Sequence, residues 1–532
     1  RGGGGGGVGG LIDFRPQQLG RTAADRRRLG RGVRGVRGRM RFVLDCSPRF
    51  DYGRADHQLE VTRDGAVFRT PDLHVTLHAR GLERHGDGVR ASFELDEGEY
   101  NGAILESAAE EPPRAFDREE VRELFDDTER FWTGWLARST HRGRWRDMVF
   151  RSAITLKLMI YAPTGAPVAA PTAGLPEQIG GERNWDYRYT WVRDGSFSVS
   201  TLLALGFTDE AAAFTRWLGD RIRERSGGDG DPLQIMYRVD GSPDLEEVTL
   251  AMDGYRGSQP VRIGNGAADQ FQLDIYGEMV DALARADQAG LTLDHATWVE
   301  LSQTIDWLCD NWNRDEAGIW ETRGGPQPFT YGRLMTWVAF DRAVRLATAR
   351  GRPADLARWT AERDRVYREI MEKGFDAERG AFVQHYGSQV LDASLLKMPL
   401  VGFIAPDDPM WLSTLAAMDG ILVSDSLVYR YDPAASPDGL RGSEGTFSMC
   451  TFWYVQALAR SGRLRDARIA FEKMHTYANH LGLFSEEIGP TGEQLGNFPQ
   501  AFSHLALINT ATLLADLLDR AGAGAETTAA IQ

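Results

Sequence analysis

Residues 458–467, LARSGRLRDA, separate two stretches that each carry apolar side chains at helical spacing. The break at Ser461 and Gly462 is short, and two helices joined in this way pack together as a hairpin. The same rhythm recurs along most of the chain. Start and stop signals predict helices over 118–137, 143–162, 196–205, 208–225, 267–288, 294–312, 331–350, 353–373, 408–418, 443–461, 464–478 and 500–520.

These serial hairpins show no sharp sequence repeat at solenoid periods, so a closed helical toroid is favoured over an open array. The pattern is different from about Gly32 to Leu105, where short runs such as LEVTRDGAVFRT (59–70) alternate between turn signals. Alternation with a period of two predicts antiparallel strands and a β-sandwich. The composition changes after Pro112 and Pro113, which mark the boundary between the two parts.

The totals exclude several classes of function. A chain of 532 residues is long enough for two or more domains, and its formal charge is 61 − 76 = −15. The arginines between Arg21 and Arg41 offer an alternative reading as a nucleic-acid patch, but the acidic total and their alternation with strand residues argue against nucleic acid. No apolar run has the length of a membrane span. Three distant cysteines and the lack of a visible signal peptide indicate a reducing, cytoplasmic location.

Long insertions between the predicted helices are the places to look for function, over 163–195, 227–266, 313–330, 421–442 and 479–499. The stretch NWDYRYTWVRDGS (184–196) combines tryptophans and tyrosines with two arginines and two aspartates. Flat aromatic rings stack on the apolar faces of sugars, while Arg and Asp bond to hydroxyl groups. A sugar is therefore the ligand that this inventory favours.

Hydrolysis of a glycosidic bond needs two carboxyl groups, one protonated and one ionised. Glu321 in GIWETRGG follows Trp320, and an apolar ring beside a carboxyl raises its pKa, as a general acid requires. Glu486 or Glu487 in FSEEIGP is the candidate base. Each signal has a plainer interpretation: a Trp-Glu pair at a surface, SEE as a helix start, and Asp186 or Asp194 as a helix cap.

Four motifs in order resemble the bacterial branch of glycoside hydrolase family 15, the glucoamylase and trehalase-like glucosidases. They are NWDYRYTWVRDGSFSVSTLLALGF (184–207), RIGNGAADQFQLDIYGEMVDAL (262–283), GIWETRGGPQPFTYGRLMTWVAFDRA (318–343) and GEQLGNFPQAFSHLALINTA (492–511). The resemblance implies a mainly α protein, with a β-sandwich, a linker helix and an (α/α)6 barrel that carries the active site at one end. The expected domains are a low-complexity leader (1–10), a partial sandwich that lacks its first strands (11–113), a linker helix (114–140), the barrel (141–522) and a disordered tail (523–532).

The resemblance also implies roles for individual residues. Glu321 matches the general acid and Glu486 the general base, with Glu487 as the alternative base. The residues expected to bind the terminal glucose are Trp191, Arg193, Asp194, Trp320, Arg430 and Glu444. No metal or organic cofactor is expected.

The implied reaction releases β-glucose, with inversion, from trehalose or from the non-reducing end of malto- or isomalto-oligosaccharides. Trehalose is the first substrate to test. Two alternatives stay open: an inverting phosphorylase on the same barrel, and a sugar-binding protein without catalysis.

Overall fold

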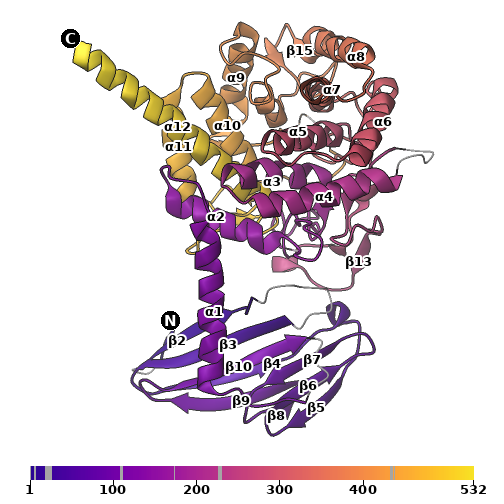
Figure 1. The fold of residues 1–532 in the computed structure, drawn as a ribbon. Helices are drawn as coiled ribbons and strands as arrows, with labels where there is room; N and C mark the ends of the chain where they lie inside the picture. The colour runs from indigo at the N-terminus through magenta and orange to yellow at the C-terminus, as the bar shows by residue number, and fades with distance from the viewer. Residues whose placement is uncertain are drawn as a thin grey trace. The chain divides into compact units, whose positions relative to one another are not determined.

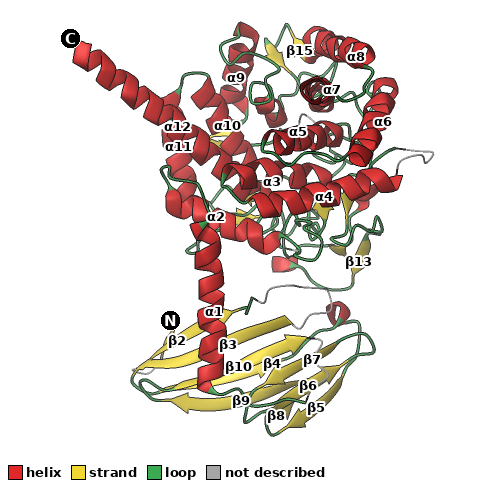
Figure 2. Ribbon diagram, in the orientation of Figure 1, coloured by secondary structure: helices red, strands yellow, loops and turns green. Residues whose placement is uncertain are grey.

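The computed structural model of the chain describes residues 2–4, 7–17, 27–107, 112–172, 174–225, 231–431, 435 and 438–531 (Figure 1). The fold divides into two compact units, one up to Arg138 and one from Ser139 onward. Strands dominate the first unit and helices the second (Figure 2).

The first unit contains two antiparallel sheets. The larger has the order β1-β2-β3-β10-β7-β6-β5 and the smaller the order β4-β9-β8. The strands are β1 Gly2–Gly4, β2 Gly7–Phe14, β3 Arg27–Arg37, β4 Met40–Cys46, β5 Gln58–Thr62, β6 Gly65–Arg69, β7 His74–His78, β8 Glu83–His85, β9 Gly88–Leu95 and β10 Tyr100–Ser107.

One hydrophobic cluster joins the two sheets. Phe68 on β6 and Leu77 on β7 pack with Val89 and Ala91 on β9, and all four are buried. Side chains from both sheets therefore fill one core, which confirms the expected β-sandwich. Helix α1 (Arg118–Ala137) belongs to the same unit, and its Phe125 meets Phe14 of β2 edge-on at 5.6 Å between ring centroids.

The glycine-rich leader corrects an expectation. We predicted that residues 1–10 lie outside the fold, but β1 and β2 occupy most of this stretch, and β2 pairs with β3. Strand pairing needs only backbone N–H and C=O groups, which glycine supplies. At Gly7 and Gly9 an added Cβ would lie 2.4 Å from Met40 Cγ and 2.7 Å from Phe42 Cζ, so the lack of side chains lets the strand fit here.

The second unit is built around a closed ring of inner segments. Contacts run from α3 to α5, α7, the 3₁₀ segment η5, α10 and α12, and α12 returns to α3. These segments are α3 Val192–Ala204, α5 Asp274–Gln288, α7 Thr330–Arg350, η5 Ala393–Lys397, α10 Ser448–Arg460 and α12 Ala501–Ile531. The ring is the (α/α)6-type barrel that the sequence led us to expect, with one inner position filled by a short 3₁₀ turn.

The remaining helices pack outside this ring. In α11, buried Ala467, Ala470, Phe471 and Met474 form a single stripe at i, i+3, i+4 and i+7, which is typical of an outer helix. The outer helices are α2 Arg146–Met159, α4 Thr208–Arg225, α6 His295–Asn311, α8 Leu356–Glu369, α9 Pro409–Ile421 and α11 Leu464–Met474.

Short strand pairs and helical turns link the helices. The strands are β11 Thr190–Trp191, β12 Met236–Tyr237, β13 Val248–Leu250, β14 Val261–Ile263, β15 Phe375–Asp376, β16 Ala381–Phe382, β17 Val423–Ser424, β18 Leu427–Val428, β19 Thr446–Phe447, β20 Glu487–Ile488 and β21 Gln494–Leu495. Single helical turns occupy η1 Asp51–Gly53, η2 Tyr255–Gly257, η3 Gly266–Asp269, η4 Ile370–Gly374 and η6 His475–Tyr477.

Helix α12 differs from expectation at its end. We predicted a disordered tail over 523–532, but the helix continues to Ile531, and Gln532 lies outside the described residues. Alanines in AGAGAETTAAI favour this continuation. The sequence analysis found no apolar run of membrane-spanning length, but the part from Ala501 to Gly522 is long and apolar enough to span a membrane. Within the structure 67% of its apolar window is buried, as in the core helix of a globular unit.

Candidate active site

A cavity of about 420 Å³ lies where several inner helices begin. Its lining comes from the starts of α3, α10 and α12 and from the loop that precedes α7. These helices therefore direct their N-terminal ends, which carry partial positive charge, toward one place. The lining residues are Ala169, Tyr187, Trp191, Arg193, Asp194, Ile319, Trp320, Glu321, Arg430, Phe447, Met449, Glu486, Gln500 and Phe502.

One wall comes from the junction of β11 and α3. We expected a helix from residue 196, but α3 starts at Val192, so Arg193 and Asp194 lie in its first turn. Arg193 is 5% exposed, and its Nη1 donates to Gln272 Oε1 at 2.9 Å and to Asp274 Oδ2 at 3.2 Å. This residue is therefore held rigidly, and its other amino group, Nη2, is directed at the carboxyl group of Glu321.

Asp194 has an unsatisfied carboxylate oxygen in this wall. The side chain is buried, and its Oδ1 accepts no hydrogen bond from the described residues. Burial, followed by the neighbouring charge of Glu321, raises the pKa of Asp194 to about 7. A buried acceptor without a donor is costly, so the site favours a ligand that brings hydroxyl groups.

Glu321 lies in the loop before α7 in a left-handed backbone conformation, with φ 56°. Such strain in a residue other than glycine is typical of functional positions. Its Oε1 accepts from Trp191 Nε1 at 2.6 Å and from Arg193 Nη2 at 3.1 Å. The wall and the carboxyl group are thus parts of one hydrogen-bonded unit.

Trp320 has a different role from the one expected. We predicted that its ring would give Glu321 an apolar setting, but the polar groups of Trp191 and Arg193 contact that carboxyl group. Trp320 Nε1 instead donates to Asp392 Oδ1 at 2.9 Å. The indole lines the cavity.

Glu486 lies at a different part of the cavity lining, just before β20. The sheet β19-β20-β21 fixes its backbone, because Ser448 N donates to Glu486 O at 2.9 Å and Glu486 N to Asn497 O at 3.0 Å. Its carboxyl oxygens accept from Asn497 N at 2.9 Å and Gln500 Nε2 at 3.1 Å, and Tyr187 also hydrogen-bonds to it. Burial and then the charge of Glu177 raise the pKa of Glu486 to about 8.

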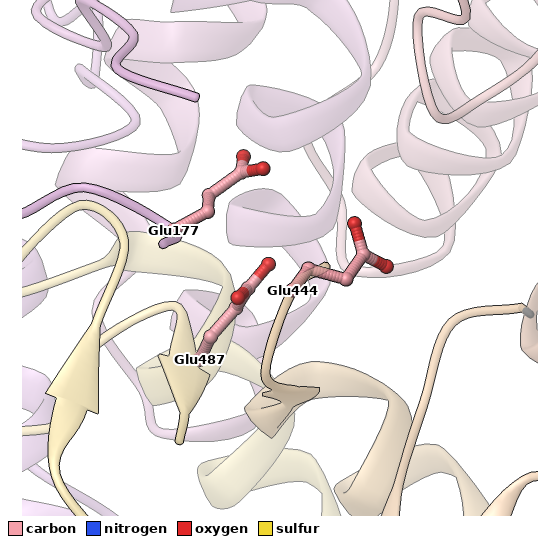
Figure 3. Close-up of side chains that lie close together, drawn as sticks. All are labelled: Glu177, Glu444 and Glu487. Carbon is pink, nitrogen blue, oxygen red and sulfur yellow. The ribbon is translucent and has the colours of Figure 1, made fainter. Parts of the chain in front are cut away.

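Glu487 points into a different environment. It is fully buried, its Oε2 accepts from Gly445 N at 2.8 Å, and it does not line the cavity. Figure 3 shows its side chain close to those of Glu177 and Glu444. One carboxylate oxygen of each residue lies within 4.8 Å of the other two. This arrangement favours Glu486 over Glu487 as the group that faces a ligand.

Two arginines neutralise much of this glutamate cluster. Arg430 binds Glu444 through two hydrogen bonds of 2.8 and 2.5 Å, and Arg183 Nη1 lies 3.5 Å from Glu444 Oε2. Three such carboxylates are a possible donor set for a metal ion, but the guanidinium groups already provide positive charge at Glu444 and, at 3.6 and 3.8 Å, at Glu177.

This geometry corrects the role of Glu444. We expected it to bind substrate, but it lies behind Arg430 and does not line the cavity, while Arg430 does. A bidentate carboxylate fixes the plane of a guanidinium group, so Glu444 positions Arg430. The two residues lie 14 positions apart in the sequence, and this spacing does not show which of them reaches the ligand.

Several lining or supporting residues were missed. Tyr187 lies within the quoted aromatic stretch, and its neighbours in sequence were the available signal. Gln500, which contacts Glu486, is the residue before α12 and looks like an ordinary helix start. Glu177 and Asp392 had no distinguishing local pattern, because their partners lie far away in sequence.

Comparisons with known proteins identify relatives of the chain. The sequence profile of Glycosyl hydrolases family 15 matches residues 143–512. A trehalase of Mycobacterium tuberculosis (strain ATCC 25618 / H37Rv) is 40% identical over 495 residues, which cover 90% of this chain and 72% of the relative. A trehalase of Thermoplasma acidophilum is 38% identical over 480 residues, which cover 89% of this chain and 81% of the relative.

Among solved structures, a bacterial glucoamylase complexed with acarbose matches with a TM-score of 0.74. The match covers 95% of this chain and 83% of that chain, at 14% sequence identity. At this identity the likeness shows a shared fold, and it extends over both the strand-rich and the helical units.

Proposed function

We propose that this chain, which belongs to glycosyl hydrolases family 15, is an inverting α-glucosidase that acts on trehalose. The observation that carries the proposal is that Glu321 and Glu486 reach one cavity from separate loops. The trehalases among its relatives, at 38 to 40% identity, support trehalose as the substrate. The chain is a glycoside hydrolase, and what is proposed is its substrate, its stereochemistry and the roles of these residues.

The side of the cavity where Asp194 Oδ1 lacks a hydrogen-bond donor would receive the glucose ring whose anomeric carbon reacts. Asp194 Oδ1 would accept from sugar hydroxyl groups, and Arg430 would donate to others. Trp191 and Trp320 would contact the apolar ring faces. A sugar with a hydroxyl group in the wrong orientation would leave Asp194 unpaired, which disfavours epimers of glucose.

In the reaction, Glu321 donates its proton to the oxygen that links the two sugars, and the bond from this oxygen to the anomeric carbon breaks. A water molecule attacks this carbon from the opposite face and gives its proton to Glu486. The products from trehalose are one β-glucose and one α-glucose. For this route the two carboxyl groups need a separation of roughly 6.5–9.5 Å, which leaves room for the water.

The experiment that tests the substrate is a comparison of kcat/KM for trehalose, maltose and isomaltose, with Glu321→Gln as the inactive control. We expect the highest value for trehalose. A higher value for isomaltose would reassign the substrate, and this sugar belongs in the panel because an isomaltose glucohydrolase of Kribbella flavida is 27% identical over half of the chain.

Product analysis separates the remaining alternatives. A hydrolase gives two glucose molecules per trehalose, even when inorganic phosphate is present. Formation of glucose 1-phosphate would indicate a phosphorylase. Binding of trehalose without turnover by the intact protein would indicate a sugar-binding protein.

A further inference from the structure

We propose that Arg323 is a specificity-determining residue for the leaving sugar; this assignment rests on the function proposed above, in which that sugar occupies a second cavity next to the first. The second cavity has a volume of about 430 Å³. It shares Tyr187, Trp320, Glu321 and Arg430 with the first cavity. Its remaining lining residues are Glu177, Trp185, Asn265, Ala267, Thr322, Arg323, Asp438 and Leu440.

The position of Glu321, which lines both cavities, indicates which sugar the second cavity would bind. A general acid protonates the oxygen that joins two sugars, so it must lie between the sites for those sugars. Trp191, Arg193 and Asp194 line only the first cavity of the two, and they provide the unsatisfied acceptor for the reacting ring. The cavity on the other side of the same carboxyl group is then the place for the departing ring.

The second cavity has the polar lining that a sugar needs. Glu177 is 2% exposed, and its Oε1 accepts from Trp185 Nε1 at 2.8 Å, while its Oε2 accepts no hydrogen bond from the described residues. Asn265 and Thr322 add neutral donors and acceptors. A ligand rich in hydroxyl groups therefore suits this lining better than an apolar or a strongly charged one.

Arg323 lines the second cavity but not the first, and it has donor groups to spare. Its Nη2 pairs with Glu247 Oε2 at 3.1 Å, and its guanidinium carbon lies 4.7 Å from the centroid of the Trp185 ring. A guanidinium group has five N–H donors, and among the described residues this one pair is the side-chain hydrogen bond that Arg323 makes. The remaining donors are available to hydroxyl groups of the leaving sugar.

Arg262 provides a matched control. It lies 4.9 Å from the same Trp185 ring and 3.4 Å from the same Glu247 carboxylate, but it does not line the second cavity. If Arg323 acted only by holding Trp185 and Glu247 in place, loss of Arg262 would have a similar effect. If Arg323 binds the leaving sugar directly, the two arginines differ.

The test compares two substrates that share the reacting glucose but differ in the leaving group: trehalose and α-glucosyl fluoride. In Arg323→Ala we expect kcat/KM on trehalose to fall at least about tenfold more than on α-glucosyl fluoride, because a lost charge-assisted hydrogen bond affects only the leaving sugar. In Arg262→Ala we expect the two substrates to change by the same factor, within about threefold.

The inference would be overturned if Arg323→Ala lowered kcat/KM by the same factor on both substrates. It would also be overturned if Arg262→Ala lowered kcat/KM on trehalose, relative to α-glucosyl fluoride, as much as Arg323→Ala does. Hydrolysis of α-glucosyl fluoride by each variant shows that the site of the reacting glucose and the general base Glu486 are in place. A wild-type protein that hydrolyses α-glucosyl fluoride but not trehalose would instead contradict the proposed substrate, so the two failures are distinguishable.

Discussion

Adjacent glutamates in the chain have different chemical surroundings in the fold. Glu486 lines the cavity, whereas Glu487 accepts from the Gly445 backbone and lies with Glu177 and Glu444. We predict that Glu486→Gln lowers kcat on trehalose by about 10²–10⁴, the usual contribution of a general base. Glu487→Gln keeps an oxygen for the Gly445 N–H and is expected to lower kcat by less than about tenfold.

Steady-state kinetics of both variants, with thermal melts to show that each is folded, check this prediction. The reverse ranking would make Glu487 the base and would require a cavity that the structure does not have among its described residues.

The pH dependence of the reaction depends on the same residue. Burial raises the pKa of Glu486 to about 8 from 4.5, and the hydrogen bond from Tyr187 opposes this rise. A general base works when ionised, so kcat/KM is expected to increase with pH as Glu486 loses its proton. Removal of the hydroxyl group in Tyr187→Phe should move this ascending limb to higher pH.

The measurement is kcat/KM against pH with α-glucosyl fluoride, whose leaving group needs no proton from Glu321. An ascending limb near the ordinary pKa of a glutamate, about 4.3, that does not move in Tyr187→Phe would refute the assignment.

Sequence reasoning reached the residues with strong local patterns and missed those defined by distant partners. Trp191, Arg193, Asp194 and Glu321 were predicted and do lie around one cavity. Asp392 was not predicted, because its contact with Trp320 joins residues 72 positions apart. Glu444 was predicted to bind substrate, because its nearness in sequence to Arg430 does not show which of the two side chains lines the cavity.

At the scale of elements, the inner helices are packed so closely that a methyl group decides their fit. Gly277 of α5 faces α7, and a Cβ there would lie 2.1 Å from the Met335 carbonyl oxygen. We predict that Gly277→Ala destabilises the helical unit by about 1–3 kcal/mol through overpacking, although alanine is the better helix former.

Gly420 of α9 is the matched control, because an added Cβ there meets no atom within 4 Å. Gly420→Ala is expected to leave stability unchanged or raise it by up to about 1 kcal/mol. Urea unfolding followed by tryptophan fluorescence compares the two variants. Equal midpoints would show that α5 and α7 are not in such close contact.

The helices were largely predictable from the sequence, since each of the twelve predicted ranges overlaps an α-helix in the described residues. The starts of the helices near the cavity were less predictable. α3 starts earlier than expected, and residues 446–447 form β19 rather than the start of a helix. Here pairing with β20 outweighs local helical preference, and such long-range pairing leaves no periodic signal. The short segment η5, which completes the inner ring, was missed because its five residues are too few to show a helical period.

At the scale of the whole molecule, several buried carboxyl groups link stability to pH. Their pKa values are raised above the ordinary range mainly by burial, so between about pH 4.5 and 8 the folded state holds protons that the unfolded state has lost. Stability then falls as pH rises. The groups and their pKa values are Glu177, Asp194 and Glu278 at about 7, and Glu316 and Glu486 at about 8.

Buried histidines act in the opposite direction, but only at lower pH. Burial lowers the pKa of His78, His141, His475 and His504, so at pH 6.5 only the unfolded state holds part of these protons, and above about pH 7.5 the four are neutral in both states and contribute nothing. Burial also lowers the pKa of Lys397, so this residue makes stability rise with pH, but it is one group against the five carboxyl groups named above. We therefore predict that Tm decreases from pH 6.5 to 8.5.

Glu316→Gln should make this decrease shallower, because it removes one group with a raised pKa, and Glu316 does not line either cavity. Calorimetric melts of both proteins across this pH range provide the check. A Tm that increases with pH, or an identical slope in the variant, would contradict the role of buried carboxyl groups.

The most direct test of the account is the stereochemistry of trehalose hydrolysis, followed by proton NMR before the released sugars mutarotate. If Glu321 acts as acid and Glu486 directs a water molecule to the opposite face, β-glucose and α-glucose appear in equal amounts from the first spectra. Early release of α-glucose alone would mean that configuration is retained. That result would contradict the assignment of Glu321 and Glu486 as an inverting pair.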